Sequence, residues 1–249
     1  MPNNQLRFRF ERELGQLDFS DFAASADLEE QNVYGGNVDL EPEQRWITEL
    51  TYERRFWGEG VVSIGYRHDE IIDAIDRIPL AGGLSAVGNI GEGTLDRLSL
   101  NVTVPLDKLG VTGARFTFRN DWNKTEVTDP TTGEKRPISG VRPTQANVGL
   151  EQDITRLKLQ WGVNWLPYLG QPSYSPDQVS RWRGTDYFEL FAEYKPSPTL
   201  AIRAQLNLWD DFTQSRTVFA DRDTRAVAFV EDSVVDPRTF ASIRVRKTF

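Results

Sequence analysis

The sequence has 249 residues, a formal net charge of −8 from 37 acidic and 29 basic side chains, no cysteine and one histidine. The negative charge argues against nucleic acid as the main partner, because phosphate binding relies on a basic surface. The lack of cysteine excludes disulfides, thiolate catalysis and cysteine-ligated zinc. Mean hydropathy is −0.49, and no apolar run approaches the roughly 20 residues that a membrane-spanning helix needs.

Alternation of apolar and polar residues predicts about ten strands of roughly nine or ten residues each, and no amphipathic helix. In the first of them, Leu6, Phe8 and Phe10 point to one side while Arg7 and Arg9 point to the other. The chain is therefore predicted to be all-β. In chain order, the predicted strands span residues 6–13, 45–56, 61–70, 96–104, 114–123, 144–152, 157–166, 186–194, 200–209 and 241–249.

The connections between these strands alternate between short turns and long polar loops. A transmembrane barrel has this pattern, because its periplasmic turns are short and its extracellular loops are long. A soluble lipocalin-like barrel also alternates along its strands, but with the apolar face inward, and the one-sided loop lengths disfavour it. The sequence predicts an antiparallel, up-and-down transmembrane β-barrel segment with long loops at approximately residues 14–44, 71–95, 124–143, 167–185 and 210–240.

Aromatic and charged residues support this prediction. Several tryptophans and tyrosines lie near strand ends, where the interfacial girdles of a membrane barrel would place them. These are Trp46, Trp57, Trp122, Trp165, Trp209, Tyr187 and Tyr194. Charges on the opposite face would line a lumen, which we interpret as a hydrated, salt-bridged wall. The alternative is that they form a path for an anionic ligand or contacts for a plug inside the lumen. They are Arg7, Arg9, Arg115, Arg119, Arg203, Arg244, Arg246, Glu11, Glu49 and Glu53.

Two acidic segments are weak candidates for metal sites. His68, Asp69 and Glu70 lie where a strand meets a long loop, but they lack the ligand set of a zinc site. The second candidate is acidic and would bind calcium through Asp221, Asp223, Glu231 and Asp232. These four residues lack the spacing of an EF-hand loop, and we interpret them as part of an exposed acidic loop. The sequence thus predicts no metal site, no cofactor and no catalytic residue.

The last predicted strand alternates towards an aromatic end, with Ile243, Val245 and Phe249 on one side. It resembles the C-terminal signature of bacterial outer-membrane proteins, although Lys247 stands where an apolar residue is commoner. The resemblance implies that these three residues are a signal for the barrel-assembly machinery. An aromatic end of this kind suits the membrane interface.

A second segment, 36–44, is similar to the Asn-Pro-Asp-Leu-Lys-Pro-Glu segment of TonB-dependent receptors. Val38 and Glu41 depart from that pattern, whereas the matching residues are Asn37, Asp39, Leu40, Pro42 and Glu43. The resemblance implies a Gram-negative outer-membrane barrel of about 22 strands with a plugged lumen. It also implies TonB-dependent uptake of a bulky ligand such as a ferric siderophore.

We accordingly expect residues 1–249 to be a single β-barrel region, the C-terminal portion of a receptor barrel in the bacterial outer membrane. Neither a plug domain nor a signal peptide is visible, so we expect the TonB complex to act only through a plug outside this sequence. Outer-membrane lipid is the other expected partner, and no enzymatic activity is expected. The alternatives are a self-contained small barrel, either a pore or an outer-membrane enzyme such as a protease or lipase, and the soluble ligand-binding barrel.

Overall fold

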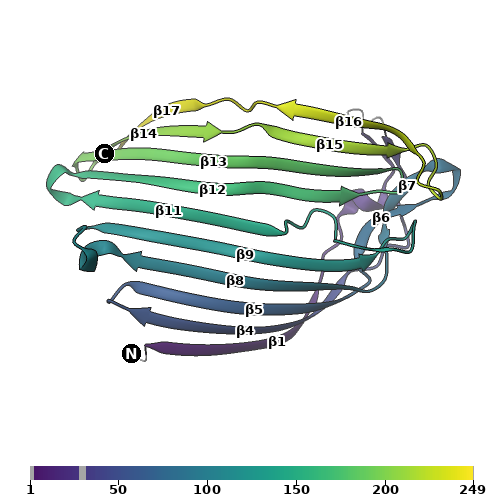
Figure 1. Cartoon of the computed structure of the whole chain (residues 1–249), viewed down its shortest axis with the longest axis horizontal. Helices are drawn as coiled ribbons and strands as arrows, with labels where there is room; N and C mark the ends of the chain where they lie inside the picture. Colours follow the sequence, from purple (N-terminus) through teal and green to yellow (C-terminus); the bar gives the residue numbers. More distant parts are fainter. Residues whose placement is uncertain (1–2, 28–31, 249) are drawn as a thin grey trace.

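The computed structural model describes residues 3–27 and 32–248, which form β-strands and short 3-10 turns but no α-helix. Ten long strands lie side by side in one antiparallel sheet, in the order β1-β4-β5-β8-β9-β11-β12-β13-β14-β17 (Figure 1). Each corresponds to one predicted strand, which confirms the all-β prediction. Their bounds are β1 (Asn4–Leu14), β4 (Gln44–Phe56), β5 (Gly60–Ile72), β8 (Gly93–Pro105), β9 (Ala114–Thr128), β11 (Thr144–Ile154), β12 (Leu159–Tyr174), β13 (Gln178–Ser197), β14 (Leu200–Trp209) and β17 (Phe240–Lys247).

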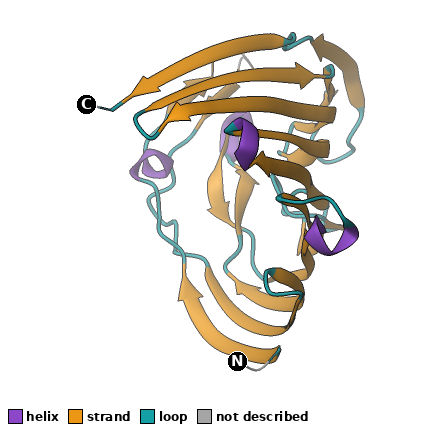
Figure 2. Cartoon of the chain, turned by 90° about the vertical axis from the view of Figure 1, so that its left-hand side faces the viewer, coloured by secondary structure: helices purple, strands orange, loops and turns teal. Residues whose placement is uncertain are grey.

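The sheet curls into an arc that does not close. Viewed along the strands, it sweeps from the edge near the N-terminus to the edge near the C-terminus (Figure 2). Among the described residues, β1 pairs only with β4, and β17 pairs only with β14. The architecture is therefore that of a barrel fragment with two open edges.

One face of the sheet, here called the apolar face, carries continuous cross-strand ladders of apolar side chains. Leu6 lies opposite Tyr52, Tyr52 opposite Ile64, and Ile64 opposite Leu100. These side chains are not covered by protein, since Leu6 is 66% exposed and Ile64 is 47% exposed. A slip of one residue would move each ladder to the other face, so the alternation fixes the register.

The opposite face, here called the polar face, is covered at one end. Ile71, Leu95 and Val127 belong to this face and are at most 3% exposed. They pack with Ala74 and with the partly buried Ile90 and Ile138, which lie beyond the strand ends. Burial of these apolar side chains, at roughly 25 cal/mol per Å², holds the connecting segments against the polar face.

The long connections all lie at this covered end, the long-loop end, but they are more ordered than predicted. Residues 71–95 contain a hairpin of β6 (Ile75–Pro79) and β7 (Ser85–Asn89), which joins a second, small sheet of order β2-β3-β7-β6. Residues 167–185 are no loop, because β12 and β13 continue to a turn at 175–177. The remaining elements of the long connections are η1 (Phe19–Phe22), β2 (Ser25–Asp27), β3 (Asn32–Tyr34), η2 (Ala81–Gly83), β10 (Lys135–Arg136), β15 (Phe212–Phe219) and β16 (Val227–Val235).

The short connections lie at the other end, the short-turn end, as predicted. Two of them contain a 3-10 turn, η3 (Leu106–Leu109) and η4 (Thr155–Leu157). The sequence predicts that β12 begins at residue 157, whereas it begins at Leu159 after Lys158 takes a left-handed backbone conformation with φ 53°. The two ends are thus built differently, as the one-sided connections predict.

Two of the aromatic residues predicted near the interfacial girdles face the other way. Tyr187 lies directly opposite Trp209, and the two ring centroids are 4.0 Å apart. The Tyr187 hydroxyl donates to Oδ1 of Asn207, a polar-face residue that is 2% exposed. The strand alternation therefore puts this pair on the polar face rather than towards lipid.

Candidate functional site

The long-loop end is the candidate functional site, because segments from all five long connections meet there. Function in barrels and sandwiches is usually carried by loops that a rigid scaffold holds. Here the scaffold is the set of paired strands, which brings the long-loop ends of β4, β5, β8 and β9 together beside the segments that connect them. Two clusters of charged side chains, described next, connect these segments to each other.

The first cluster is the Arg222 clamp, which consists of Arg222, Asp177 and the tip of the β6–β7 hairpin. The Arg222 guanidinium donates to both Asp177 carboxylate oxygens, at 2.5 and 2.7 Å. It also donates to the carbonyl oxygens of Leu80, Gly83 and Leu84, at 3.3, 2.6 and 2.9 Å. The hydrogen bonds that Arg222 donates to Asp177 raise the pKa of Arg222 above its ordinary value. The charged guanidinium ties three connections together.

The local backbone explains why the carbonyl groups converge on Arg222. Gly82 and Gly83 have φ angles of 76° and 81°, in the left-handed region that glycine adopts without strain. This conformation turns the hairpin tip back, and the Leu80 amide donates to the Leu84 carbonyl at 2.8 Å. Arg222 can then reach several carbonyl oxygens at one place, a geometry that the five donors of a guanidinium suit well.

The second cluster is the buried ion cluster, made of Asp76, Asp129, Arg136 and Arg225. Arg136 lies 2.9 Å from Asp76 and 2.7 Å from Asp129, and all three side chains are at most 8% exposed. Arg225 contacts Asp129 at 3.4 Å. Because removal of one partner from a buried ion pair costs about 3–5 kcal/mol, this cluster holds residues of three different connections in fixed positions.

Aromatic rings and amides complete the surroundings of the buried ion cluster. The Arg136 guanidinium carbon lies 4.6 Å from the centre of the Tyr174 ring, and that of Arg225 lies 4.6 Å from the Phe219 ring. Asp129 also accepts hydrogen bonds from the amides of Thr131 and Thr132, at 2.8 and 3.0 Å. Burial raises the pKa of Asp129, but the Arg136 and amide hydrogen bonds outweigh this effect and hold the pKa below its ordinary value.

The first long connection joins the same assembly through its last residues. The Gly35 amide donates to the Ser85 carbonyl at 2.8 Å, and the Asn37 side-chain amide donates to the Val87 carbonyl at 3.1 Å. β3 also pairs in parallel with β7. Together with the two charged clusters, these contacts link all five long connections, and we call the linked segments the cap.

Comparison with known protein families shows which family the chain belongs to. The model for the TonB dependent receptor-like β-barrel matches residues 4–208, which is most of the chain. The chain belongs to the TonB-dependent receptor family. A search of curated proteins gives no match.

Solved structures of one receptor share the fold. The ferric enterobactin receptor PfeA of Pseudomonas aeruginosa, in a mutant form with enterobactin, aligns with a TM-score of 0.64 at 15% identity. A second mutant form aligns with a TM-score of 0.61, also at 15% identity. Both alignments cover 100% of this chain, but only 39% and 38% of the receptor chains. The chain thus has the fold of part of a receptor barrel.

Residues 36–44, whose similarity to a segment of these receptors stays a prediction, anchor the cap to the start of β4. The Asn37 side-chain oxygen accepts from the Asp39 amide at 3.1 Å, and Leu40 is 5% exposed. Glu43 accepts from the Ile75 amide at 3.1 Å and lies 2.6 Å from Arg45. Pro42 directly precedes Glu43 in this turn. The segment therefore joins the first connection of the receptor barrel to the β6–β7 hairpin.

The residues predicted to signal barrel assembly lie on the open edge strand β17. Val245 lies opposite Ile202 and Ile243 opposite Ala204, so both belong to the apolar face, where they are 63% and 77% exposed. Phe249 lies outside the described residues. That the barrel-assembly machinery recognises these residues stays a prediction.

The structure separates the residues of the weak metal candidates. Asp69 lies on the polar face and is held by Arg67 at 2.6 Å, whereas His68 lies on the apolar face, 2.8 Å from Asp96. Asp221 accepts from the Thr224 amide, and Glu231 pairs with Arg216. In the described part of the chain, no group of three or more acidic, histidine or cysteine side chains could hold a metal ion. No helix there is long and apolar enough to cross a membrane.

The polar face of the receptor barrel carries the salt bridges predicted for its wall. Arg7 lies 3.4 Å from Glu53, and Arg9 lies 3.4 Å from Glu49. Another pair, Arg203 with Glu189, is separated by 3.2 Å. These pairs bridge neighbouring strands across the face, as a hydrated barrel wall would.

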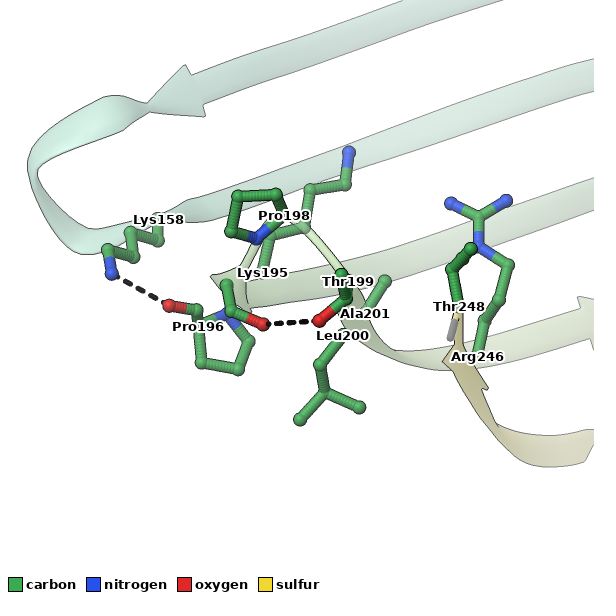
Figure 3. A pocket seen from close by; sticks show the side chains of 10 residues that line it. Lys158, Lys195, Pro196, Pro198, Thr199, Leu200, Ala201, Arg246 and Thr248 are labelled. Carbon is green, nitrogen blue, oxygen red and sulfur yellow. Dashed lines mark hydrogen bonds between the residues drawn. The ribbon is translucent and has the colours of Figure 1, made fainter.

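A pocket at the short-turn end, of about 560 Å³, lies beside the end of β17 (Figure 3). Its lysines already have partners: Lys158 donates to the Pro196 carbonyl at 2.7 Å, and Lys195 lies 2.7 Å from Glu193. These contacts stabilise the turn between β13 and β14. The pocket is therefore part of the turn structure rather than of the cap.

Sequence reasoning missed the residues that hold the cap together. Arg222 and Arg136 lie in segments without alternation, and Arg222 meets carbonyl groups 138 to 142 residues away in the sequence. No local pattern marks such a pairing. The one usable signal is the Gly82-Gly83 pair, which indicates a sharp hairpin tip.

Proposed function

We propose that this chain is the C-terminal portion of an outer-membrane receptor barrel that captures a bulky ligand at the cap for TonB-dependent uptake. The observation that carries the proposal is the linked cap at one end of an apolar-faced barrel sheet. The family match and the shared fold support it. Residues 1–249 form a single barrel region in this proposal, with no enzymatic role.

In this proposal the receptor barrel has three partners: lipid, the barrel-assembly machinery and the TonB complex. The exposed apolar face contacts outer-membrane lipid, where charged side chains at mid-membrane would cost roughly 2–4 kcal/mol each. β17 is the segment read by the barrel-assembly machinery. The TonB complex acts through a plug domain outside this sequence.

A ferric siderophore is the ligand class we propose. The structural neighbours are ferric enterobactin receptors, but their identity of 15% supports the fold and not the specificity. The soluble lipocalin-like alternative loses support, because the exposed face is apolar and the covered face carries the charges. The closed ten-strand pore also loses support, because the two edge strands do not pair within the described residues.

Uptake of radioactive iron by the source organism tests this proposal. We expect disruption of the gene to reduce uptake from at least one of a panel of ferric siderophores by tenfold or more under iron limitation. Uptake from ferric citrate or other siderophores in the same panel serves as the control. Unchanged uptake across the whole panel would contradict the siderophore assignment.

An immunoblot of the outer-membrane fraction, with an antibody against residues 124–143, tests location and architecture. We expect a membrane-bound band far above 28.4 kDa, because the proposal requires a plug and further strands. A membrane-bound band near 28.4 kDa would instead favour a small independent barrel.

A further inference from the structure

β16 and β17 form one continuous border of the sheet, here called the β16–β17 edge. β14 and β15 lie end to end beside β13, which pairs with both of them. β16 and β17 repeat this arrangement one step further out, since β16 pairs with β15 and β17 pairs with β14. Figure 1 shows the two strands end to end along the border of the sheet. The edge runs from residue 227 to residue 247 and is interrupted only at 236–239.

β16 has the composition of a covered strand. Natural sheets protect a free edge with lysine or proline, but β16 contains neither. Its charged residues are Glu231 and Asp232, and Glu231 is already paired with Arg216 of β15 at 2.6 Å. The alternation places apolar side chains on both faces of the strand, whereas the barrel strands have one apolar face. The large hydrophobic residues of β16, which are all 49–63% exposed, are Val227, Phe229, Val230, Val234 and Val235.

The edge of β6 shows how this chain satisfies a strand edge by itself. Within the described residues β6 pairs only with β7, and it ends at Pro79. Side chains accept from its amides: Ile75 donates to Glu43 at 3.1 Å, and Arg77 donates to Asp76 at 2.8 Å. In the described part of the chain, no side chain accepts from an amide of β16, whose ladder bonds go to β15 alone. The outer side of β16 therefore suits a partner strand.

We propose that the receptor strand that closes the sheet on β17 continues beyond the membrane as the partner of β16. The edge of β17 needs such a strand, because hydrocarbon does not tolerate unpaired backbone groups. A straight continuation brings the same strand alongside β16, where it covers the exposed valines. This chain covers only 38% and 39% of the matching receptor chains, so such receptors have further chain from which the strand can come.

This pairing would connect the rest of the barrel to the cap. The loop between β15 and β16 carries Arg222 and Arg225, which hold the Arg222 clamp and the buried ion cluster together. A strand paired with β16 therefore lies next to the segment that anchors the cap. The inference rests on the proposed receptor function, which requires strands outside this sequence.

Amide hydrogen exchange of the native receptor, purified in detergent from the source's outer membrane, tests the pairing residue by residue. Successive amides of a strand point to opposite sides, so a free edge leaves every second amide of residues 228–234 open to water. We expect all these amides to be protected to within about tenfold of those of β15, which pairs on both sides. Alternate amides that exchange at least about 100-fold faster than their neighbours would overturn the proposal.

Two proline substitutions test the same pairing through the backbone. The amides of Val230 and Ser233 are three residues apart and point to opposite sides of β16. If the strand is paired on both sides, Val230→Pro and Ser233→Pro each remove a ladder hydrogen bond, and each should speed exchange across 228–234 at least about tenfold. Val230→Ala and Ser233→Ala are the matched controls, because they keep the amide. Tolerance of one of the two prolines would show that the outer side of β16 is free.

Photocrosslinking of the native receptor identifies the partner. Benzoylphenylalanine in place of Val234, which is 63% exposed, should link to a peptide of the same polypeptide outside residues 1–249, with no gain in mass on a denaturing gel. A crosslink to a second copy or to another protein would overturn the proposal. The immunoblot shows whether further strands exist, whereas exchange at β16 shows whether one of them pairs there. Failure of the receptor proposal and failure of this inference therefore give different results.

Discussion

Single residues decide how firmly the cap is held, and Asp129 is the clearest case. Its carboxylate lies 2.7 Å from Arg136 and 3.4 Å from Arg225, in a position that is 8% exposed. Each arginine comes from a different connection. Loss of this one carboxylate therefore removes ion pairs of both the β9–β11 and the β15–β16 segments.

The lowered pKa of Asp129 predicts an acid-sensitive cap. Because the folded-state pKa lies below the ordinary value of 3.8, the ionised carboxylate stabilises the cap above that pH. This stabilisation is lost as pH falls through the folded-state pKa. We expect hydrogen exchange at residues 129–138, corrected for intrinsic rates, to stay slow from neutral pH down to about pH 4 and to rise in stronger acid.

Asp129→Asn removes the charge at every pH and leaves two arginines in a buried site. We expect fast exchange of the same segment at neutral pH and little further change in acid. Asp221→Asn is the matched control, because Asp221 also has a lowered pKa but owes it to Thr224 rather than to arginine. Equal effects of the two substitutions would show that the buried ion cluster does not hold the cap.

At the scale of elements, the strands were predictable because each presents an apolar face of period 2. Leu6, Phe8 and Phe10 mark β1 in this way. The extensions of β12 and β13 to residues 174 and 178 were not predictable, because segments such as 180–184 do not carry an apolar side chain at every second position. The cap could not be derived from the sequence either. The Arg222 clamp depends on how the strands pair in the sheet, because this pairing brings residues 80–84 beside residues 177 and 222.

Packing between two strands predicts the effect of a larger side chain at Gly162. A Cβ atom there would lie 2.6 Å from the Phe191 ring and 3.2 Å from the Leu150 carbonyl oxygen. The same ring lies 3.9 Å from the Arg203 guanidinium carbon. Gly162→Val should therefore destabilise the native receptor by about 1–3 kcal/mol, the usual cost of overpacking, in urea unfolding followed by tryptophan fluorescence.

Gly65→Ala is the control for Gly162, because Gly65 also lies on the polar face of a strand. Its added Cβ would meet Thr51 at 3.4 Å, an ordinary contact distance. We expect a change of under about 1 kcal/mol, within the ordinary range for strand substitutions. If both variants unfold at the same urea concentration, the contact between Gly162 and Phe191 is unimportant for stability.

At the scale of the whole molecule, the two open edges dominate. Within the described residues, β1 and β17 each pair with a neighbouring strand on one side only, next to an apolar face. Hydrocarbon does not tolerate strand edges whose backbone groups stay unpaired. Strand number along the chain was predictable. Closure was not, because a local alternation is the same in a closed barrel and in an open arc.

We expect the 249-residue chain, refolded alone into detergent micelles, to aggregate or remain heat-insensitive on a semi-native gel. Supplying the remaining strands of the barrel should restore a compact, heat-modifiable band, because both edges then find partners. The native receptor purified from membranes serves as the positive control. A clear heat-dependent shift of the chain alone would mean that it closes by itself.

The Arg222 clamp has a consequence for sequence variation. Arg222 holds the β6–β7 tip through the carbonyl oxygens of Leu80, Gly83 and Leu84, and every residue type supplies such an oxygen. The Arg222 contacts therefore make no demand on the side chains of Leu80 and Leu84, as long as the Leu80 amide and the two left-handed glycines keep the backbone turned. A barrel built in this way can acquire new surface chemistry at this hairpin tip while the anchoring of its cap stays the same.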